Sequence, residues 1–145
     1  MPLSLGPEFL RFLGEKELIV LGTARRDGTV HLVPVWYEFS EGHFWVNGGW
    51  NRLWLKSALR DPNRRITLFL KDSTQARRWA EIRARVLEAT EEGARDHIEK
   101  LSRRHTGEAY RHRLGAPDRV KVKIEPLGVV GLNGGFGKWD VTTTG

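Results

Sequence analysis

The sequence predicts a mainly β fold in which six to seven antiparallel strands close into a small barrel, with two to four helices at its periphery. Apolar, β-prone segments recur along the chain, and turn sequences such as Asp27-Gly28 and Ser40-Glu41-Gly42 separate several of them. Most connections are therefore short hairpins, which favour antiparallel pairing. Strands of this number and curvature bury their apolar faces best when the sheet closes on itself.

The amino-terminal region predicts a short helix followed by a β-hairpin. Residues Pro7 to Leu13 form an apolar-rich segment after Gly6, typical of a helix that covers one end of a sheet. The β-prone segments Leu18 to Ala24 and Val30 to Phe39 flank Asp27-Gly28. Because glycine tolerates positive φ, this dipeptide is a strong signal for a tight turn between two strands.

The second strand of this hairpin contains a proline. Both faces of Val30 to Phe39 are largely apolar, which indicates a central strand. Pro34 has no amide hydrogen to donate to a neighbouring strand. We therefore expect a β-bulge or a gap in pairing there, where the backbone is free to contact a ligand. An edge strand or a bulge without function fits this pattern equally well.

A third strand and a basic helix follow. The turn Ser40-Glu41-Gly42 leads into the aromatic strand His43 to Asn47. Gly48-Gly49 then breaks the sheet, and the helix-prone run Trp50 to Arg60 follows at once. Asp61-Pro62 stops this helix, because proline cannot continue it.

The rest of the chain adds three strands and one helix. The apolar run Ile66 to Leu70 predicts a strand, and Trp79 to Glu88 alternates with small inward residues that suit a tightly curved barrel. Thr90 to Arg104 predicts a helix, with glutamates at its positive end. Arg119 to Glu125 alternates again, and we expect Pro126 to end that strand.

Length and composition fit one domain over residues 1–130 and a glycine-rich tail over residues 131–145. On this tail, Trp139 is either an interface anchor or part of a disordered end.

The absence of cysteine excludes disulfides and thiolate metal sites, and no apolar run reaches membrane-spanning length. The expectation is a soluble cytoplasmic protein. A net charge of +6 suggests an anionic partner, which could be nucleic acid, an acidic lipid surface or a phosphorylated small molecule.

No catalytic or metal-binding group stands out. The five histidines show neither an HExxH arrangement nor a carboxylate at ligand spacing, so we expect no protein metal site. A nucleophile and its base are recognised by geometry and cannot be assembled from these residues. His31, beside the expected bulge, could approach a cofactor, although a half-buried strand histidine is the commoner outcome.

The basic helix offers a candidate phosphate site. Arg52 and Lys56 are four residues apart, so both would project from one helical face, with Asn51 near the helix start. The amides of the first turn and two cations would meet a phosphate together. A basic face that is merely solvated is the simpler alternative. Trp50 and Trp54 are predicted first as core or interface residues, and only second as surfaces for a flat ring.

At these residues the chain resembles a known family. The segment Thr23 to Tyr37 looks like the first hairpin of the pyridoxamine 5'-phosphate oxidase-like split-barrel proteins, which bind FMN or a deazaflavin. The segment Lys56 to Pro62, leading into Ile66-Thr-Leu, resembles that family's phosphate-proximal helix and next strand. With Trp79 to Glu88 and Val120 to Pro126 in the corresponding places, the resemblance covers nearly the whole chain.

The resemblance implies an antiparallel split barrel that forms a homodimer and binds FMN or the 8-hydroxy-5-deazaflavin coenzyme F-420 in a groove between subunits. It places Arg52 and Lys56 at the cofactor phosphate and residues 33–36 beside the ring. The expected cofactor-binding residues are Val33, Pro34, Val35, Trp36, Asn51, Arg52, Lys56 and Ser57. The carboxy-terminal substrate signature of true pyridoxamine phosphate oxidases is absent, so that substrate is not expected.

The activity that this resemblance implies is an oxidoreductase that transfers hydride to a small unsaturated or quinone-like molecule. The cofactor would carry the chemistry, so the missing catalytic motif is no objection. One alternative is a flavin, haem or tetrapyrrole binder of the same fold without turnover. Another is a basic module that binds nucleic acid or other anions, although the arginine pairs that would favour it are dispersed along the chain.

Overall fold

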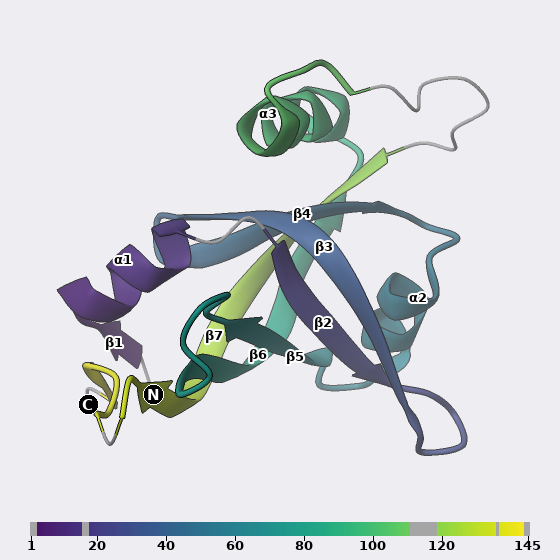
Figure 1. The fold of residues 1–145 in the computed structure, drawn as a ribbon. Helices are drawn as coiled ribbons and strands as arrows, with labels where there is room; N and C mark the ends of the chain where they lie inside the picture. Colours follow the sequence, from purple (N-terminus) through teal and green to yellow (C-terminus); the bar gives the residue numbers. More distant parts are fainter. Residues whose placement is uncertain (1–2, 16–17, 111–118, 136, 144–145) are drawn as a thin grey trace.

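The computed structural model describes residues 3–15, 18–110, 119–135 and 137–143, and its main feature is a closed six-stranded antiparallel barrel (Figure 1). The barrel strands follow one another in the order β2-β3-β4-β7-β6-β5, and β5 pairs with β2 to close the circle. A separate two-stranded sheet joins β1 to β8. The mainly β prediction is confirmed.

The elements have these bounds: β1 Leu3–Leu5, α1 Pro7–Glu15, β2 Leu18–Ala24, β3 Val30–Ser40, β4 His43–Gly49, α2 Leu53–Arg60, β5 Arg65–Lys71, β6 Arg78–Thr90, α3 Ala94–Thr106, β7 Arg119–Asn133 and β8 Val141–Thr143. Helices α1, α2 and α3 lie at separate places around the barrel (Figure 1). None of the helices among the described residues is both long and apolar enough to cross a membrane.

The first hairpin forms as predicted. Strands β2 and β3 pair in a continuous register from Leu18 opposite Trp36 to Ala24 opposite Val30. Gly28 has a φ of 87°, which explains why a glycine stands in this turn. The carboxylate of Asp27 accepts a hydrogen bond from the amide of Thr29 at 3.0 Å and so closes the turn.

The predicted gap in pairing at Pro34 is present, but the bulge is not. Pro34 lies opposite Val20 of β2 without a register shift. On its other side, β3 pairs with β4 only from Tyr37 to Ser40. Among the described strands, the half of β3 before Tyr37 therefore has one neighbour and one free edge.

The prediction that Gly48-Gly49 breaks the sheet is wrong. Both glycines continue β4, where they pair with Val120 and Arg119 of β7. The helix starts at Leu53 instead of Trp50, because the chain first turns through a hydrogen bond from the amide of Arg52 to the carbonyl of Gly49, 3.0 Å long. Two glycines permit an extended strand as readily as a break, so composition alone could not separate the two outcomes.

The prediction that Pro126 ends its strand is also wrong. Strand β7 continues to Asn133, so it crosses the expected boundary between residues 130 and 131. Pro126 lies opposite Ala84, and the register between β6 and β7 shifts beside it, between Arg83 and Ala84. A proline is tolerated at such an irregularity because no ladder hydrogen bond is required of it.

Helix α3 starts later than predicted. Thr90 is the last residue of β6, and the helix begins at Ala94 after Gly93, whose φ of 72° turns the chain. The Thr90 hydroxyl accepts a hydrogen bond from the amide of Glu92 at 3.1 Å, so it caps the turn and not the helix. Gly107, with a φ of 76°, ends the helix.

The segment after β7 packs on its own chain. Trp139 is 7% exposed, and its ring stacks on Phe12 of α1 at a centroid distance of 4.7 Å. The indole nitrogen donates to the carbonyl of Trp79 at 2.9 Å. Neither expectation for Trp139, an interface anchor or a disordered end, describes this arrangement. The indole instead joins the core at the end of the barrel that α1 covers.

Candidate functional site

A groove with a volume of about 590 Å³ lies between the free edge of β3 and the connection from β4 to α2. Leu101 of α3 and Arg119 of β7 complete its walls. One side is apolar, and the opposite side carries polar and basic groups. Because both kinds of surface meet in one groove, it suits a ligand that has an apolar body and an anionic group.

The apolar side is the unpaired half of β3. Four consecutive residues of that strand, Val33 to Trp36, line the groove. Neighbouring strand residues point to opposite faces of a sheet, so four in a row can do this only if the groove runs along the free edge of the strand. Trp36 is held by His105 of α3, whose ring stacks on the indole at a centroid distance of 5.5 Å and an interplanar angle of 16°.

The basic end begins at the start of α2. Arg52 has an extended backbone, with a φ of −73° and a ψ of 132°, and lies immediately before the first helical residue. The first amides of a helix have no partner within it, and the helix dipole makes this end partly positive. Asn51 lines the groove beside Arg52. An anion here would therefore meet backbone donors and a guanidinium together.

Arg119, the first residue of β7, is a buried cation on the groove. Only 8% of the residue is exposed, and its Nε donates to Oδ1 of Asn47 at 2.8 Å. The guanidinium carbon lies 5.4 Å from the ring centroid of Tyr110. Burial lowers the pKa of Arg119, Tyr110 opposes this effect, and the positive charges of Arg52 and Arg95 add to it. Arginine nevertheless stays protonated in proteins, so this end of the groove is positive.

Asn47 links this arginine to a polar network beneath α3. Its Nδ2 lies 2.8 Å from the carbonyl of Ala94 and 3.1 Å from Nδ1 of His97. The other ring nitrogen of His97 lies 3.5 Å from Glu38, which also pairs with Lys100 at 2.9 Å. Burial lowers the pKa of His97 to about 4, so the ring is neutral at physiological pH.

The groove collects most of the residues expected to bind a cofactor. Those that line it are Val33, Pro34, Val35, Trp36, Asn51 and Arg52. Lys56 is exposed on α2 and does not line the groove. Ser57 is buried and lines a different cavity. The two sets separate because Arg52 precedes the helix instead of lying on its face with Lys56.

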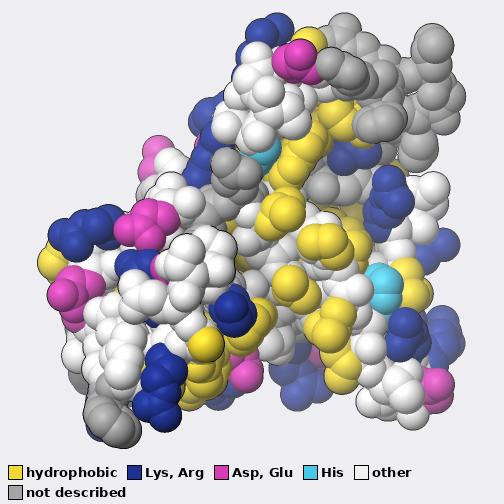
Figure 2. Space-filling model, viewed as in Figure 1, with side chains coloured by type: hydrophobic (Ala, Val, Ile, Leu, Met, Phe, Trp, Pro, Cys, Tyr) yellow, Lys and Arg dark blue, Asp and Glu magenta, His cyan; other side chains and the backbone are white. Residues whose placement is uncertain are grey.

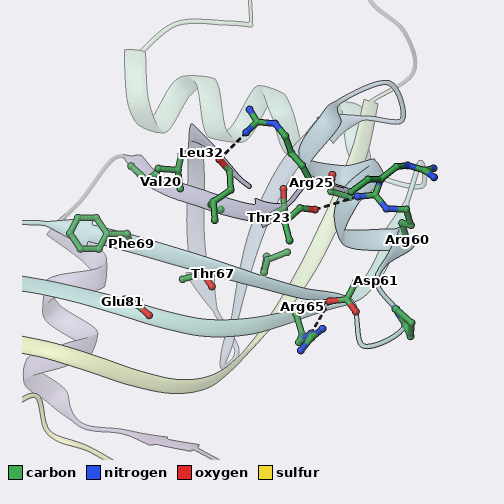
Figure 3. Close-up of a pocket in the computed structure, with 17 residues that line it drawn as sticks. Val20, Thr23, Arg25, Leu32, Arg60, Asp61, Arg65, Thr67, Phe69 and Glu81 are labelled. Atoms are coloured by element: carbon green, nitrogen blue, oxygen red, sulfur yellow. Dashed lines mark hydrogen bonds and ion pairs between the residues drawn. The ribbon is translucent and has the colours of Figure 1, made fainter. Parts of the chain in front are cut away.

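The cavity that Ser57 lines has a volume of about 710 Å³ and lies against β2, β5 and the end of α2 (Figure 3). Three arginines near it already bind groups of this chain: Arg25 donates to the carbonyl of Val30 at 3.0 Å, Arg60 to that of Ala24 at 3.3 Å, and Arg65 to the carboxylate of Asp61 at 2.9 Å. Three of the four arginines that line this cavity are therefore engaged within the chain, and Arg26 is the fourth.

An apolar patch covers the outer face of β2 and β3. Leu18, Val30 and Leu32 are 50%, 59% and 64% exposed. Figure 2 shows hydrophobic side chains gathered across the middle of this face, with lysines and arginines near its borders. Large apolar side chains gathered on one face are typical of a surface that another molecule covers.

No protein-family model and no curated protein matches the chain, but solved structures do. An F420 reductase superimposes with a TM-score of 0.73 and 21% identity, over 86% of this chain and 98% of that one. A pyridoxamine 5'-phosphate oxidase candidate from Listeria innocua gives 0.64 and 20%, over 87% and 96%. The heme storage protein HutZ from Vibrio cholerae gives 0.64 and 18%, over 94% and 98%.

These superpositions extend over most of each chain. The part that they cover includes the closed six-stranded barrel. The chain therefore has the split-barrel fold of the pyridoxamine 5'-phosphate oxidase-like proteins. At this level of identity the similarity describes the fold, and the function has to be argued from the site.

Proposed function

We propose that the chain is an oxidoreductase that binds FMN or the 8-hydroxy-5-deazaflavin coenzyme F-420 in the groove along β3. The observation that carries this proposal is the pairing of a free strand edge, Val33 to Trp36, with a basic end formed by Arg52 and Arg119. The split-barrel fold supports it, because an F420 reductase has a similar structure.

The residues present fit such a cofactor. A volume of about 590 Å³ lies within the usual range of about 300–1,000 Å³ for ligand pockets. The flat ring would lie along β3, where Trp36 offers aromatic surface and the backbone offers hydrogen-bonding groups. The phosphate would lie at the basic end, where Arg119 has no carboxylate within ion-pair distance among the described residues.

The bound cofactor would supply hydride transfer, so the chain itself needs no acid or base for that step. The side chains of β3 would fix the ring, and the arginines would fix the phosphate. The open side of the groove would admit the substrate, which we propose is a small unsaturated or quinone-like molecule.

We further propose that two copies assemble through the apolar patch on β2 and β3. Leu18, Val30 and Leu32 are each at least half exposed on one face of the hairpin, as is typical of a surface that another molecule covers, and Leu18 also lines the groove. A partner chain on this face would therefore lie beside the cofactor. In that arrangement each cofactor would be bound between two subunits.

The first test is quenching of tryptophan fluorescence as FMN, and separately coenzyme F-420, is added to the purified protein at low and high salt. Trp36 and Trp54 line the groove, so a bound ring should quench them. Saturable binding that changes little with salt is expected, and preference for one ring would identify the cofactor. The absence of binding by both would contradict the proposal.

Two variants of equal charge test the position of the site. Arg52→Ala should weaken FMN binding about 10- to 100-fold, since a charge-assisted hydrogen bond contributes about 1.5–3 kcal/mol. Lys56→Ala removes the same charge from α2 outside the groove and should change the affinity little. Equal losses in both variants would place the phosphate on the helical face that the sequence suggested.

A haem binder is the second candidate, because the heme storage protein HutZ has a similar structure and His31 lines the groove. Titration with haemin separates the two functions. A Soret band that depends on His31, together with no binding of either flavin-type cofactor, would favour the haem binder.

A further inference from the structure

We propose that Arg119 is a phosphate-binding residue of the groove and that Asn47 is the residue that positions it. This inference rests on the proposed function for the identity of the ligand, but not for the geometry of the two side chains. The chemical class of the ligand group is a phosphate ester or another compact oxyanion.

The strand register brings Arg119 to the basic end. Arg119 lies opposite Gly49, the last residue of β4. The carbonyl of Gly49 accepts a hydrogen bond from the amide of Arg52 at 3.0 Å. Two arginines distant in sequence therefore meet at one end of the groove. The positive charge of Arg52 contributes to the lowered pKa of Arg119. A doubly charged anion between them would reverse this repulsion.

Arg119 is buried in a way that leaves donors for a ligand. Its Nε is bound to Asn47, and the ring of Tyr110 lies near its guanidinium. Arg119 also lines a smaller cavity of about 230 Å³ that Glu91 and Asp96 border, but among the described residues no carboxylate lies within ion-pair distance of its guanidinium. A guanidinium held through Nε presents its two terminal nitrogens as a fork, and this fork matches two oxygens of a phosphate.

Asn47 can occupy only one orientation. The carbonyl of Ala94 can only accept a hydrogen bond, so the atom of Asn47 that faces it at 2.8 Å must be the amide nitrogen. Nε of Arg119 can only donate, so the atom that faces it at 2.8 Å must be the amide oxygen. The second hydrogen of the amide nitrogen then goes to Nδ1 of His97, which accepts it. Asn47 is 9% exposed and cannot exchange these partners for bulk water without opening the site.

The network thus fixes the position of a cation at the groove without cancelling its charge. A neutral amide is the side chain that does this, because a carboxylate at the same place would form an ion pair with the arginine and repel an incoming anion. This distinction makes Asn47→Asp, a change of one group at nearly constant shape, the most informative variant.

The experiment compares FMN with riboflavin, which has the same ring and no phosphate. In the unmodified protein FMN should bind more tightly than riboflavin. Arg119→Ala and Asn47→Asp should each reduce FMN affinity by about tenfold or more while riboflavin affinity changes little. Arg119→Lys keeps the charge but loses the fork. Its FMN affinity should therefore lie between that of the unmodified protein and that of Arg119→Ala. Lys123→Ala, which removes a cation from the same strand outside the groove, is the matched control.

Binding of inorganic phosphate, followed through the Nε–Hε resonances of the arginines, separates this inference from the proposed function. If phosphate shifts one resonance that Arg119→Ala removes, Arg119 binds phosphate even if no flavin binds. If FMN affinity is unchanged in folded Arg119→Ala, the inference is wrong while the proposed function stands. Parallel losses of FMN and riboflavin in Asn47→Asp would show a general structural role and contradict the positioning role.

Discussion

The indole of Trp54 lies against Gly48, so closely that a Cβ on this glycine would be 2.8 Å from Cζ2 of the ring. Both residues line the groove. Gly48→Ala should displace the indole and destabilise the protein by about 1–3 kcal/mol, the usual effect of an added group in a packed site. Thermal unfolding and FMN titration would measure both consequences, and unchanged affinity would show that the indole does not shape the site.

Gly14→Ala is the matched control for that substitution. Gly14 lies in α1, and nothing stands within 4 Å of the Cβ that would be added. Because alanine has the better helix propensity, this variant should be stabilised by up to about 1 kcal/mol and should bind cofactor unchanged.

His97 should make stability depend on pH. Its pKa is about 4 in the folded protein and near its usual value of 6.5 in the unfolded chain, so the unfolded state binds the proton more readily. The neutral ring therefore contributes stability that is fully present above pH 6.5 and is lost as the pH falls toward 4, on the order of 2–3 kcal/mol in total. His97→Gln should flatten urea-unfolding free energies over this interval. A profile of unchanged slope would show that another group titrates there.

Trp139→Ala should remove a large part of the packing at the end of the barrel. The ring is 7% exposed and touches Phe9 and Phe12, so about 3–5 kcal/mol of unfolding free energy should be lost. Trp50→Ala is the control, because that ring is 42% exposed. Equal effects of both substitutions on the unfolding midpoint would mean that the carboxy-terminal segment does not pack as described.

Leu32→Asp tests the assembly through the apolar patch. Leu32 is 64% exposed, so a charge there should cost the folded subunit little but should repel a partner chain. Sedimentation should show the unmodified protein as a dimer and this variant as a monomer. Leu10→Asp, at a 42% exposed position on α1, should stay dimeric. If the unmodified protein sediments as a monomer, the dimer proposal is wrong.

Local signals were enough to predict the barrel. The turn at Asp27-Gly28, the alternation in β6 and the apolar runs of β2 and β5 each depend on residues close together in sequence. The free edge at Pro34 could also be predicted, because a residue without an amide hydrogen is poorly suited to a fully paired strand. The gap at Pro34 predicted a ligand contact, and the family resemblance extended it to Val33, Val35 and Trp36.

Arg119 and Asn47 could not be predicted, because their roles depend on the pairing of β4 with β7. Residues 47 and 119 are far apart in the chain, and nothing near either residue indicates that one binds the other. The pattern from Arg119 to Glu125 predicts a strand correctly but gives no register. The basic end of the groove was therefore predicted only in part, through Asn51 and Arg52.

The prediction for the end of the chain failed for a related reason. Pro126 and the glycines after it resemble a strand terminus and a loose tail when they are considered alone. In the folded chain, β6 supplies a partner for β7 as far as Asn133, and α1 supplies a surface for Trp139. Such tertiary contacts override local propensity.

The small sheet of β1 and β8 determines how the molecule would respond to a pulling force. Leu3 pairs with Thr143 and Leu5 with Val141, so the two strands run antiparallel with their outer ends together. A pulling force applied between Leu3 and Thr143 would open this ladder one pair at a time, as a zipper opens. The three pairs of this sheet would therefore open before the closed barrel, which such a force reaches only afterwards.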